Sequence, residues 1–126
     1  MNGKARVSGL DASYYYVKDL PRATKFYTEL IGMEPTMAYA DMVSEWTFAG
    51  DESFGLYKPP EGEGSGEFHP SGGVMFRVDD VPASVEALKK SGVKFMGEGH
   101  IEETPGCHMA FGEDTEGNGF ILHHRK

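Results

Sequence analysis

The sequence contains a single cysteine, Cys107, among its 126 residues. One thiol cannot form a disulfide within the chain, and no CxxC pair is present to bind a structural zinc ion. These absences exclude a disulfide-rich secreted scaffold and a zinc ribbon, and they favour the reducing cytoplasm as the location. A chain of this length buries about two-thirds of its unfolded surface. We therefore expect one domain spanning residues 1–126 that folds without cross-links.

Long apolar runs and basic clusters are also missing. No segment approaches the roughly 18 apolar residues of a membrane span, and the opening segment MNGKARVSGLDAS lacks the apolar core of a signal peptide. The 12 Lys and Arg residues are outnumbered by 20 Asp and Glu residues, which gives a formal net charge of −8. A surface of this sign repels phosphate backbones. We therefore expect neither a membrane nor a nucleic acid as a partner.

An internal repeat organises the residues that are present. The segment YYYVKDLP at 14–21 matches MFRVDDVP at 75–82, with Val, Asp and Pro in the same places. Each copy leads into a helical pattern that ends at a glycine, Gly32 in the first half and Gly92 in the second. The Asp of each copy is placed to cap the helix, and Pro is tolerated in a first turn. The chain therefore contains two related helical units.

Strand-like segments follow both helical patterns. The expected strands are Met33–Tyr39, Ser44–Ala49 and Ser53–Lys58 in the first half and Val93–Met96, Cys107–Phe111 and Gly119–His123 in the second. A connector rich in Gly, Pro, Ser and Glu spans 58–73. The pattern predicts an α+β fold made of two tandem βαβββ modules, at 10–58 and 73–124.

This duplicated unit resembles the glyoxalase, bleomycin-resistance and extradiol-dioxygenase superfamily, also called the vicinal oxygen chelate superfamily. The resemblance rests on VKDLPRATKFYTELIGM at 17–33, on FRVDDVPASVEALKKSGV at 76–93 and on the closing DTEGNGFIL at 114–122. It implies that the two modules form a half-open, barrel-like sheet with a concave cleft. It also implies a homodimer, in which the connector would allow the modules to exchange partners.

In metal-dependent members of the superfamily, each module contributes two ligands to a divalent ion in the cleft. The resemblance places these four ligands at Ala12, Gly55, Gly73 and Ile121. None of these side chains has an oxygen or nitrogen donor. Without a metal as Lewis acid, glyoxalase-like isomerisation and extradiol chemistry lose their mechanism. We therefore predict no metal and no cofactor, and a metal-independent protein that sequesters a small molecule.

Strand alternation predicts which side chains line the cleft, because residues at even separation share a face of a strand. The predicted ligand-binding residues are Tyr14, Tyr16, Trp46, Phe48, Tyr57, Met75, Arg77, His108 and His123. The other face, predicted to pack against the helices, carries Tyr15, Val17, Phe54, Leu56, Val74, Phe76, Val78 and Leu122. An aromatic wall with one arginine suits a partly aromatic or acidic ligand. The periodicity is equally compatible with aromatic residues that fill a core. For Arg77 the alternative is a surface ion pair with Asp79 or a neighbouring Glu, and its inward parity slightly favours the cleft.

A competing hypothesis is an enzyme of the same superfamily, a lyase or isomerase, that uses His108, His123 or Tyr16 in place of the missing ligands. His108 and His123 are predicted on one face of the last hairpin, where Glu102 or Glu103 would complete a displaced metal or acid–base site. A third hypothesis is an interaction module with no ligand. The sequence assigns no catalytic residue.

Overall fold

Two copies of one strand–helix–strand pattern make up the fold. The computed structural model describes residues 8–60, 70 and 72–126. The first module contains β1 (Ala12–Tyr16), α1 (Leu20–Ile31), β2 (Met37–Tyr39), β3 (Val43–Thr47) and β4 (Ser53–Tyr57). The second contains β5 (Val74–Arg77), α2 (Val81–Lys90), β6 (Lys94–Phe95), the 3₁₀ segment η1 (Met96–Gly99), β7 (Glu102–Glu103), β8 (Cys107–Glu113) and β9 (Gly119–Arg125). The predicted α+β class is therefore confirmed, with η1 and β7 as additions that the repeat did not indicate.

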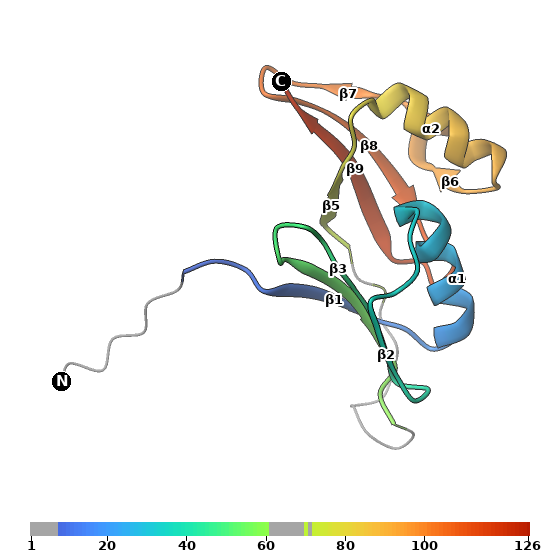
Figure 1. The fold of residues 1–126 in the computed structure, drawn as a ribbon. Coiled ribbons are helices and arrows are strands. Elements are labelled where there is room, and N and C mark those ends of the chain that lie inside the picture. Colours follow the sequence, from blue (N-terminus) through green and yellow to red (C-terminus); the bar gives the residue numbers. More distant parts are fainter. Residues whose placement is uncertain (1–7, 61–69, 71) are drawn as a thin grey trace.

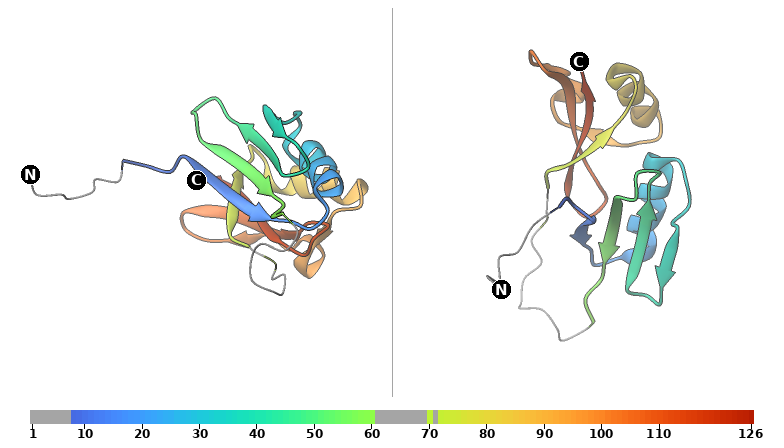
Figure 2. Two further views of the ribbon diagram at one scale, coloured as in Figure 1. Left: turned by 90° about the horizontal axis from the view of Figure 1, so that it is seen from below. Right: turned by 60° about the vertical axis from the view of Figure 1, so that its left-hand side comes forward.

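The strands form two separate sheets. The first has the order β1-β4-β3-β2, and the second has the order β5-β9-β8-β6, with β7 also paired to β8. In each module the first strand runs parallel to the last strand, and the other pairs are antiparallel. Both helices cover the same side of the two sheets, so that the opposite side is uncovered and the sheets do not close into a full barrel (Figures 1 and 2). Most of the predicted connector lies outside the described residues.

The helices begin where the repeat predicts. The Asp19 carboxylate accepts a hydrogen bond from the Arg22 backbone N–H at 3.1 Å, and the Asp80 carboxylate accepts one from Ala83 N–H at 2.9 Å. These bonds satisfy N–H groups that have no partner inside a helix. Helix α1 ends at Gly32, whose φ of 85° is favourable for glycine. Neither helix in the described part of the chain is long and apolar enough to cross a membrane.

An aromatic core lies between the helices and the sheets. Tyr27 of α1 is fully buried, and its ring centroid is 4.8 Å from that of Phe54 and 6.2 Å from that of Phe76. Phe54 and Phe76 come from different modules and are themselves 5.0 Å apart. The two modules therefore share one core. The residues predicted on the helix-facing side are confirmed there, fully or partly buried: Tyr15, Val17, Phe54, Leu56, Val74, Phe76, Val78 and Leu122.

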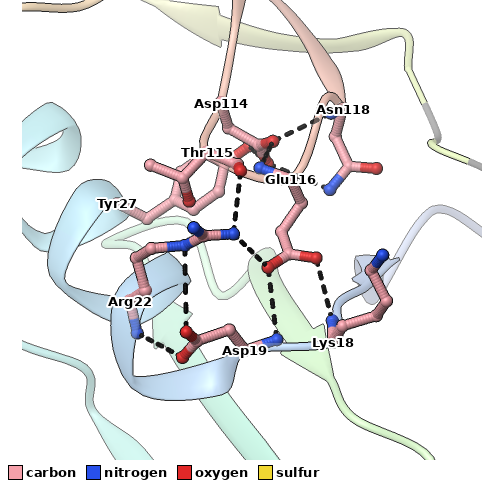
Figure 3. Close-up of polar contacts among 8 residues, drawn as sticks. All are labelled: Lys18, Asp19, Arg22, Tyr27, Asp114, Thr115, Glu116 and Asn118. Carbon is pink, nitrogen blue, oxygen red and sulfur yellow. Dashed lines mark hydrogen bonds and ion pairs between the residues drawn. The ribbon is translucent and has the colours of Figure 1, made fainter.

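Buried carboxylates join the two modules at the turn between β8 and β9 (Figure 3). Asp114 accepts hydrogen bonds from the Tyr27 hydroxyl at 2.7 Å, from the N–H of Glu116 at 2.7 Å and from the N–H of Asn118 at 2.8 Å. The Asn118 side chain adds a fourth bond at 3.0 Å. Burial of the phenol, followed by the negative charge of Asp114, raises the pKa of Tyr27. The hydroxyl therefore stays protonated and remains a donor.

Glu116 completes this junction from the same turn. Its side chain has no exposed surface, and it accepts hydrogen bonds from the N–H groups of Lys18 and Asp19 at 3.0 and 3.2 Å. The Arg22 guanidinium donates to Glu116 at 3.2 Å and to the Thr115 carbonyl at 3.1 Å (Figure 3). A turn of the second module thus holds the N-terminus of α1 in the first, where the helix dipole favours a negative charge.

We expect Asp114→Ala to lower the free energy of unfolding by about 3 kcal/mol, because it leaves several buried donors without an acceptor. Tyr27→Phe removes one donor and leaves Asp114 with three, so its cost should be about 1 kcal/mol. Urea unfolding followed by circular dichroism measures both values. Asp79→Ala, at an exposed position, is the control and should be neutral. Equal stability of Asp114→Ala and the control would contradict the role of the junction.

Candidate functional site

Tyrosines gather on the uncovered side of the first sheet, which we call the tyrosine face (Tyr14, Tyr16, Tyr39, Glu45 and Tyr57). Tyr16 pairs with Tyr57 across β1 and β4, and their rings meet edge to face with centroids 5.6 Å apart. Tyr16 is 58% exposed, so the ring pair is available to a ligand. Edge and face contacts of this kind suit a flat aromatic molecule.

Tyr14 occupies the middle of the tyrosine face. Its ring lies over Gly55, where an added Cβ would be 2.6 Å from Cε2 and 2.7 Å from Cε1 of the ring. The Tyr14 hydroxyl donates to the carboxylate of Glu45, which pairs with Gly55 from β3. Burial, the hydrogen bond and the negative charge of Glu45 raise the pKa of Tyr14 to about 12. The phenol is therefore neutral near pH 7 and acts as a hydrogen-bonding group.

An arginine marks the uncovered side of the second sheet, which we call the arginine face (Met75, Arg77, Met109, Ile121 and His123). Arg77 of β5 pairs with His123 of β9, and Met75 pairs with Ile121. Arg77 and Met75 are both exposed. Within the part of the chain that the structure describes, Arg77 forms no ion pair, so the predicted alternative of a pair with Asp79 is wrong.

The residues at the four positions implied as metal ligands do not fit a divalent ion. Ala12 and Ile121 present only carbon, and Gly73 has no side chain. At Gly55, the Tyr14 ring takes the space that a ligating side chain would need. Elsewhere in residues 8–60, 70 and 72–126, no group of three His, Cys, Asp or Glu side chains is arranged to hold a metal ion. These positions therefore supply surface for contacts and no coordination chemistry.

The structure corrects the predicted positions of Trp46 and Phe48. Trp46 pairs with Phe54, so it faces the helices, is fully buried and donates from Nε1 to the Met33 carbonyl at 2.9 Å. Phe48 also packs against the core. The cause is the turn between β3 and β4, where Phe48 N–H bonds to the Glu52 carbonyl and leaves three residues in the loop. A loop of two residues would have placed Trp46 opposite Gly55. Because the loop has one residue more, each side chain of β3 faces the other side of the sheet from the one expected.

The predicted His108–His123 site is wrong for the same kind of reason. His108 pairs with His124, whereas His123 pairs with Met109, so that His108 and His123 project from opposite faces of the hairpin. His108 Nε2 lies 3.5 Å from the Glu103 carboxylate, one of the two partners expected from the sequence. Its side chain does not belong to the arginine face. The displaced acid–base site therefore does not form as predicted.

The predicted residues thus form two groups. Tyr14, Tyr16 and Tyr57 come together on the first sheet, and Met75, Arg77 and His123 come together on the second. Glu45 is a member of the tyrosine face that the sequence analysis missed. The correct hairpin register would have revealed it, because the register places Glu45 opposite Gly55.

Comparisons with known proteins agree with this architecture. Residues 9–122 match the sequence model of the Glyoxalase/Bleomycin resistance protein/Dioxygenase superfamily. A probable lactoylglutathione lyase of Vibrio parahaemolyticus is 31% identical over 109 residues, covering 80% of this chain and 79% of that protein.

Solved structures share the fold at lower identity. A lactoylglutathione lyase from Agrobacterium tumefaciens superposes with a TM-score of 0.75 at 17% identity, covering 95% of this chain and 96% of that one. TnmS3, an antibiotic binding protein from Streptomyces sp. CB03234, superposes with a TM-score of 0.71 at 23% identity, covering 98% of this chain and 100% of that one. At these identities the likeness concerns the fold, which hosts several chemistries.

We expect Gly55→Ala to displace the Tyr14 ring and break its bond to Glu45, which lowers the pKa of Tyr14 from about 12 toward the ordinary value of 10. Ultraviolet difference titration of tyrosinate measures the change, and Tyr14→Phe identifies the signal. The stability cost should be small, because the exposed ring can swing outward.

Gly112→Ala is the matched comparison. A Cβ there would be 2.8 Å from Cε2 of Phe120, which is buried and cannot move outward. We expect it to cost about 2 kcal/mol in urea unfolding, whereas Gly106→Ala, with open space around it, should be neutral. An unchanged Tyr14 titration in Gly55→Ala would contradict the ring placement.

Proposed function

The chain belongs to the Glyoxalase/Bleomycin resistance protein/Dioxygenase superfamily, and we propose that it is a metal-independent protein that binds and sequesters a partly aromatic or acidic small molecule. The ligand would lie against the tyrosine face and the arginine face. The supporting observation is the filling of Gly55 by the Tyr14 ring. That contact puts an aromatic surface where the resemblance implies a metal-binding carboxylate or histidine.

The chemistry of the two faces supports this ligand class. The Tyr16 and Tyr57 rings offer edges and faces to a planar molecule. Arg77, exposed and without an ion-pair partner in the described residues, offers a fork of N–H donors to a carboxylate or phenolate. Met75 adds a flexible apolar contact next to Arg77. The antibiotic-binding role named for TnmS3 is consistent with such a surface.

The second candidate function is a lyase or isomerase of the superfamily. It is favoured by the 31% identity to a probable lactoylglutathione lyase. Such an activity would have to use Tyr16 or His123 on the uncovered sides of the sheets, because His108 faces away from them. The high pKa of Tyr14 leaves it a poor base near neutral pH. Binding without turnover needs no general base among these residues, and it is our preferred proposal.

We propose further that the protein is a homodimer and, from its single cysteine, that it acts in the cytoplasm. Large apolar side chains are exposed on both uncovered faces, including Tyr16, Met37, Tyr39 and Met75 at 42 to 64%. The first face carries the Glu45 carboxylate, whereas the second carries Arg77 and His123. A second copy would cover the apolar surface around the ligand, which would then lie between the two copies, and it would bring the Glu45 carboxylate and Arg77 together.

Binding is tested by isothermal titration calorimetry with a panel of planar antibiotics and aromatic acids, in buffer containing EDTA. We expect at least one panel member to bind with an affinity that EDTA leaves unchanged. Tyr16→Ala and Arg77→Ala should each weaken binding at least about fivefold. Lys25→Ala, an exposed cation on the helix side, is the control.

Two results would count against passive binding. Stoichiometric Zn, Ni, Mn or Fe in protein purified without added metal would support the enzyme. So would lactoylglutathione turnover that EDTA abolishes.

Sedimentation equilibrium tests the dimer. We expect a mass twice the 13.8 kDa of the chain. The double variant Tyr39→Asp/Met75→Asp should sediment as a monomer, because it puts charge into both apolar faces. Lys25→Asp changes charge on the helix side and should remain dimeric. A monomeric wild-type protein at micromolar concentration would refute the dimer proposal.

A further inference from the structure

A cavity of about 410 Å³ is lined by residues of both helices and of the turn between β8 and β9. Its walls come from α1, from the end of α2 with the following residues 91–94, and from the turn between β8 and β9. Both modules therefore contribute to it. We propose that this cavity is a second ligand site, and that it binds a small organic amine whose apolar body enters the cavity and whose ammonium group remains at the rim.

The size and lining of the cavity suit a small apolar body. The apolar part of the wall consists of Phe26 and Leu30 from one module and Leu88 and Val93 from the other. All four pack against the core and are only partly buried, so their remaining surface is open to a ligand. Pockets for small molecules have volumes of roughly 300–1,000 Å³, are mostly apolar and occur preferentially where structural units meet.

The charge at the rim favours a cation. Glu29 is exposed at the cavity and forms no ion pair within the described residues. Lys94 and Glu113 also line it, and they contribute one positive and one negative charge from paired positions of β6 and β8. Asp114 reaches the wall with its carboxylate already occupied by four donors. The uncompensated charge is therefore the Glu29 carboxylate.

The helix dipoles act in the same direction. Leu30 lies in the last turn of α1, and residues 91 and 92 follow the last turn of α2, so both helices point their C-termini at the cavity. Helix C-termini carry partial negative charge and attract cations. Helix α1 has no basic residue in its last turn to offset this charge, whereas α2 has Lys89 and Lys90. An ammonium group near Glu29 would meet both the carboxylate and the end of α1.

A neighbouring cavity shows why this one is selective. It has a volume of about 510 Å³ and lies between α2 and η1. Its rim combines Glu86 and Glu98 with Lys89 and Lys90, and the Lys89 ammonium is bonded to the Glu98 carbonyl at 2.9 Å. With equal numbers of acidic and basic side chains, it has no preference for one sign of charge. Glu86 therefore offers a matched control for Glu29.

The test compares two probes of similar shape and opposite charge, 2-phenylethylammonium and 3-phenylpropionate. Two-dimensional ¹H–¹⁵N spectra of the full chain report where each probe binds. We expect 2-phenylethylammonium to shift the amides of Leu88, Gly92 and Val93 and to bind at least about threefold more tightly there than the anion. The amides of Tyr16 and Arg77, on the uncovered faces, should not respond to the ammonium probe, whereas the anion belongs to the class of ligand proposed for those faces.

Substitutions then separate charge from shape. Glu29→Lys, at an exposed position, should remove the preference for the ammonium probe or reverse it, whereas Glu86→Gln should leave it unchanged. Leu88→Trp should lower affinity at least about tenfold by filling the cavity. If Leu88→Trp does not fold, the exposed substitution Glu29→Lys still tests whether charge at the rim determines the preference. Any of four results would overturn the proposal: equal affinity for the two probes, shifts confined to the uncovered faces, an unaltered preference in Glu29→Lys, or a dissociation constant above about 10 mM for the ammonium probe.

Discussion

Two buried carboxylates on one turn determine how the modules of this protein are held together. Asp114 accepts four hydrogen bonds, one of them from Tyr27 of the other module, and Glu116 accepts the N–H groups that precede α1 together with the Arg22 guanidinium. Buried charges are tolerated only when such partners surround them. These contacts fix the position of the turn relative to α1. They thereby hold the two modules against the shared aromatic core and beside the 410 Å³ cavity that both modules line.

The uncovered sides of the sheets show what this arrangement leaves for binding. The helix-facing sides are filled by aromatic rings that meet across the modules, whereas the opposite sides keep Tyr16, Met75 and Arg77 exposed. On the first sheet the phenol of Tyr14 and the carboxylate of Glu45 satisfy each other over a glycine. The surface of the first sheet is therefore polar at its centre and aromatic around it, which is the basis of the ligand class proposed above.

Local sequence patterns were sufficient for much of this structure. The repeated Val, Asp and Pro predicted both capped helices, and alternation predicted that residues such as Tyr15 and Phe54 face the helices. Register was the failure, because it depends on the number of residues in a turn, and one residue decides whether Trp46 or Glu45 faces outward. The bond between Tyr27 and Asp114 was also not predictable from sequence, because it joins residues 87 apart and exists only after the modules dock.

The seating of Tyr14 over Gly55 also constrains how this protein can evolve. A carboxylate at position 55 would supply one of the four ligands that the resemblance implies, yet the phenol ring already fills that space. The ring would have to leave before the new side chain could settle, so a side chain at position 55 becomes free only together with a change at Tyr14. The two positions are therefore coupled, and the effect of a mutation at one depends on the residue at the other.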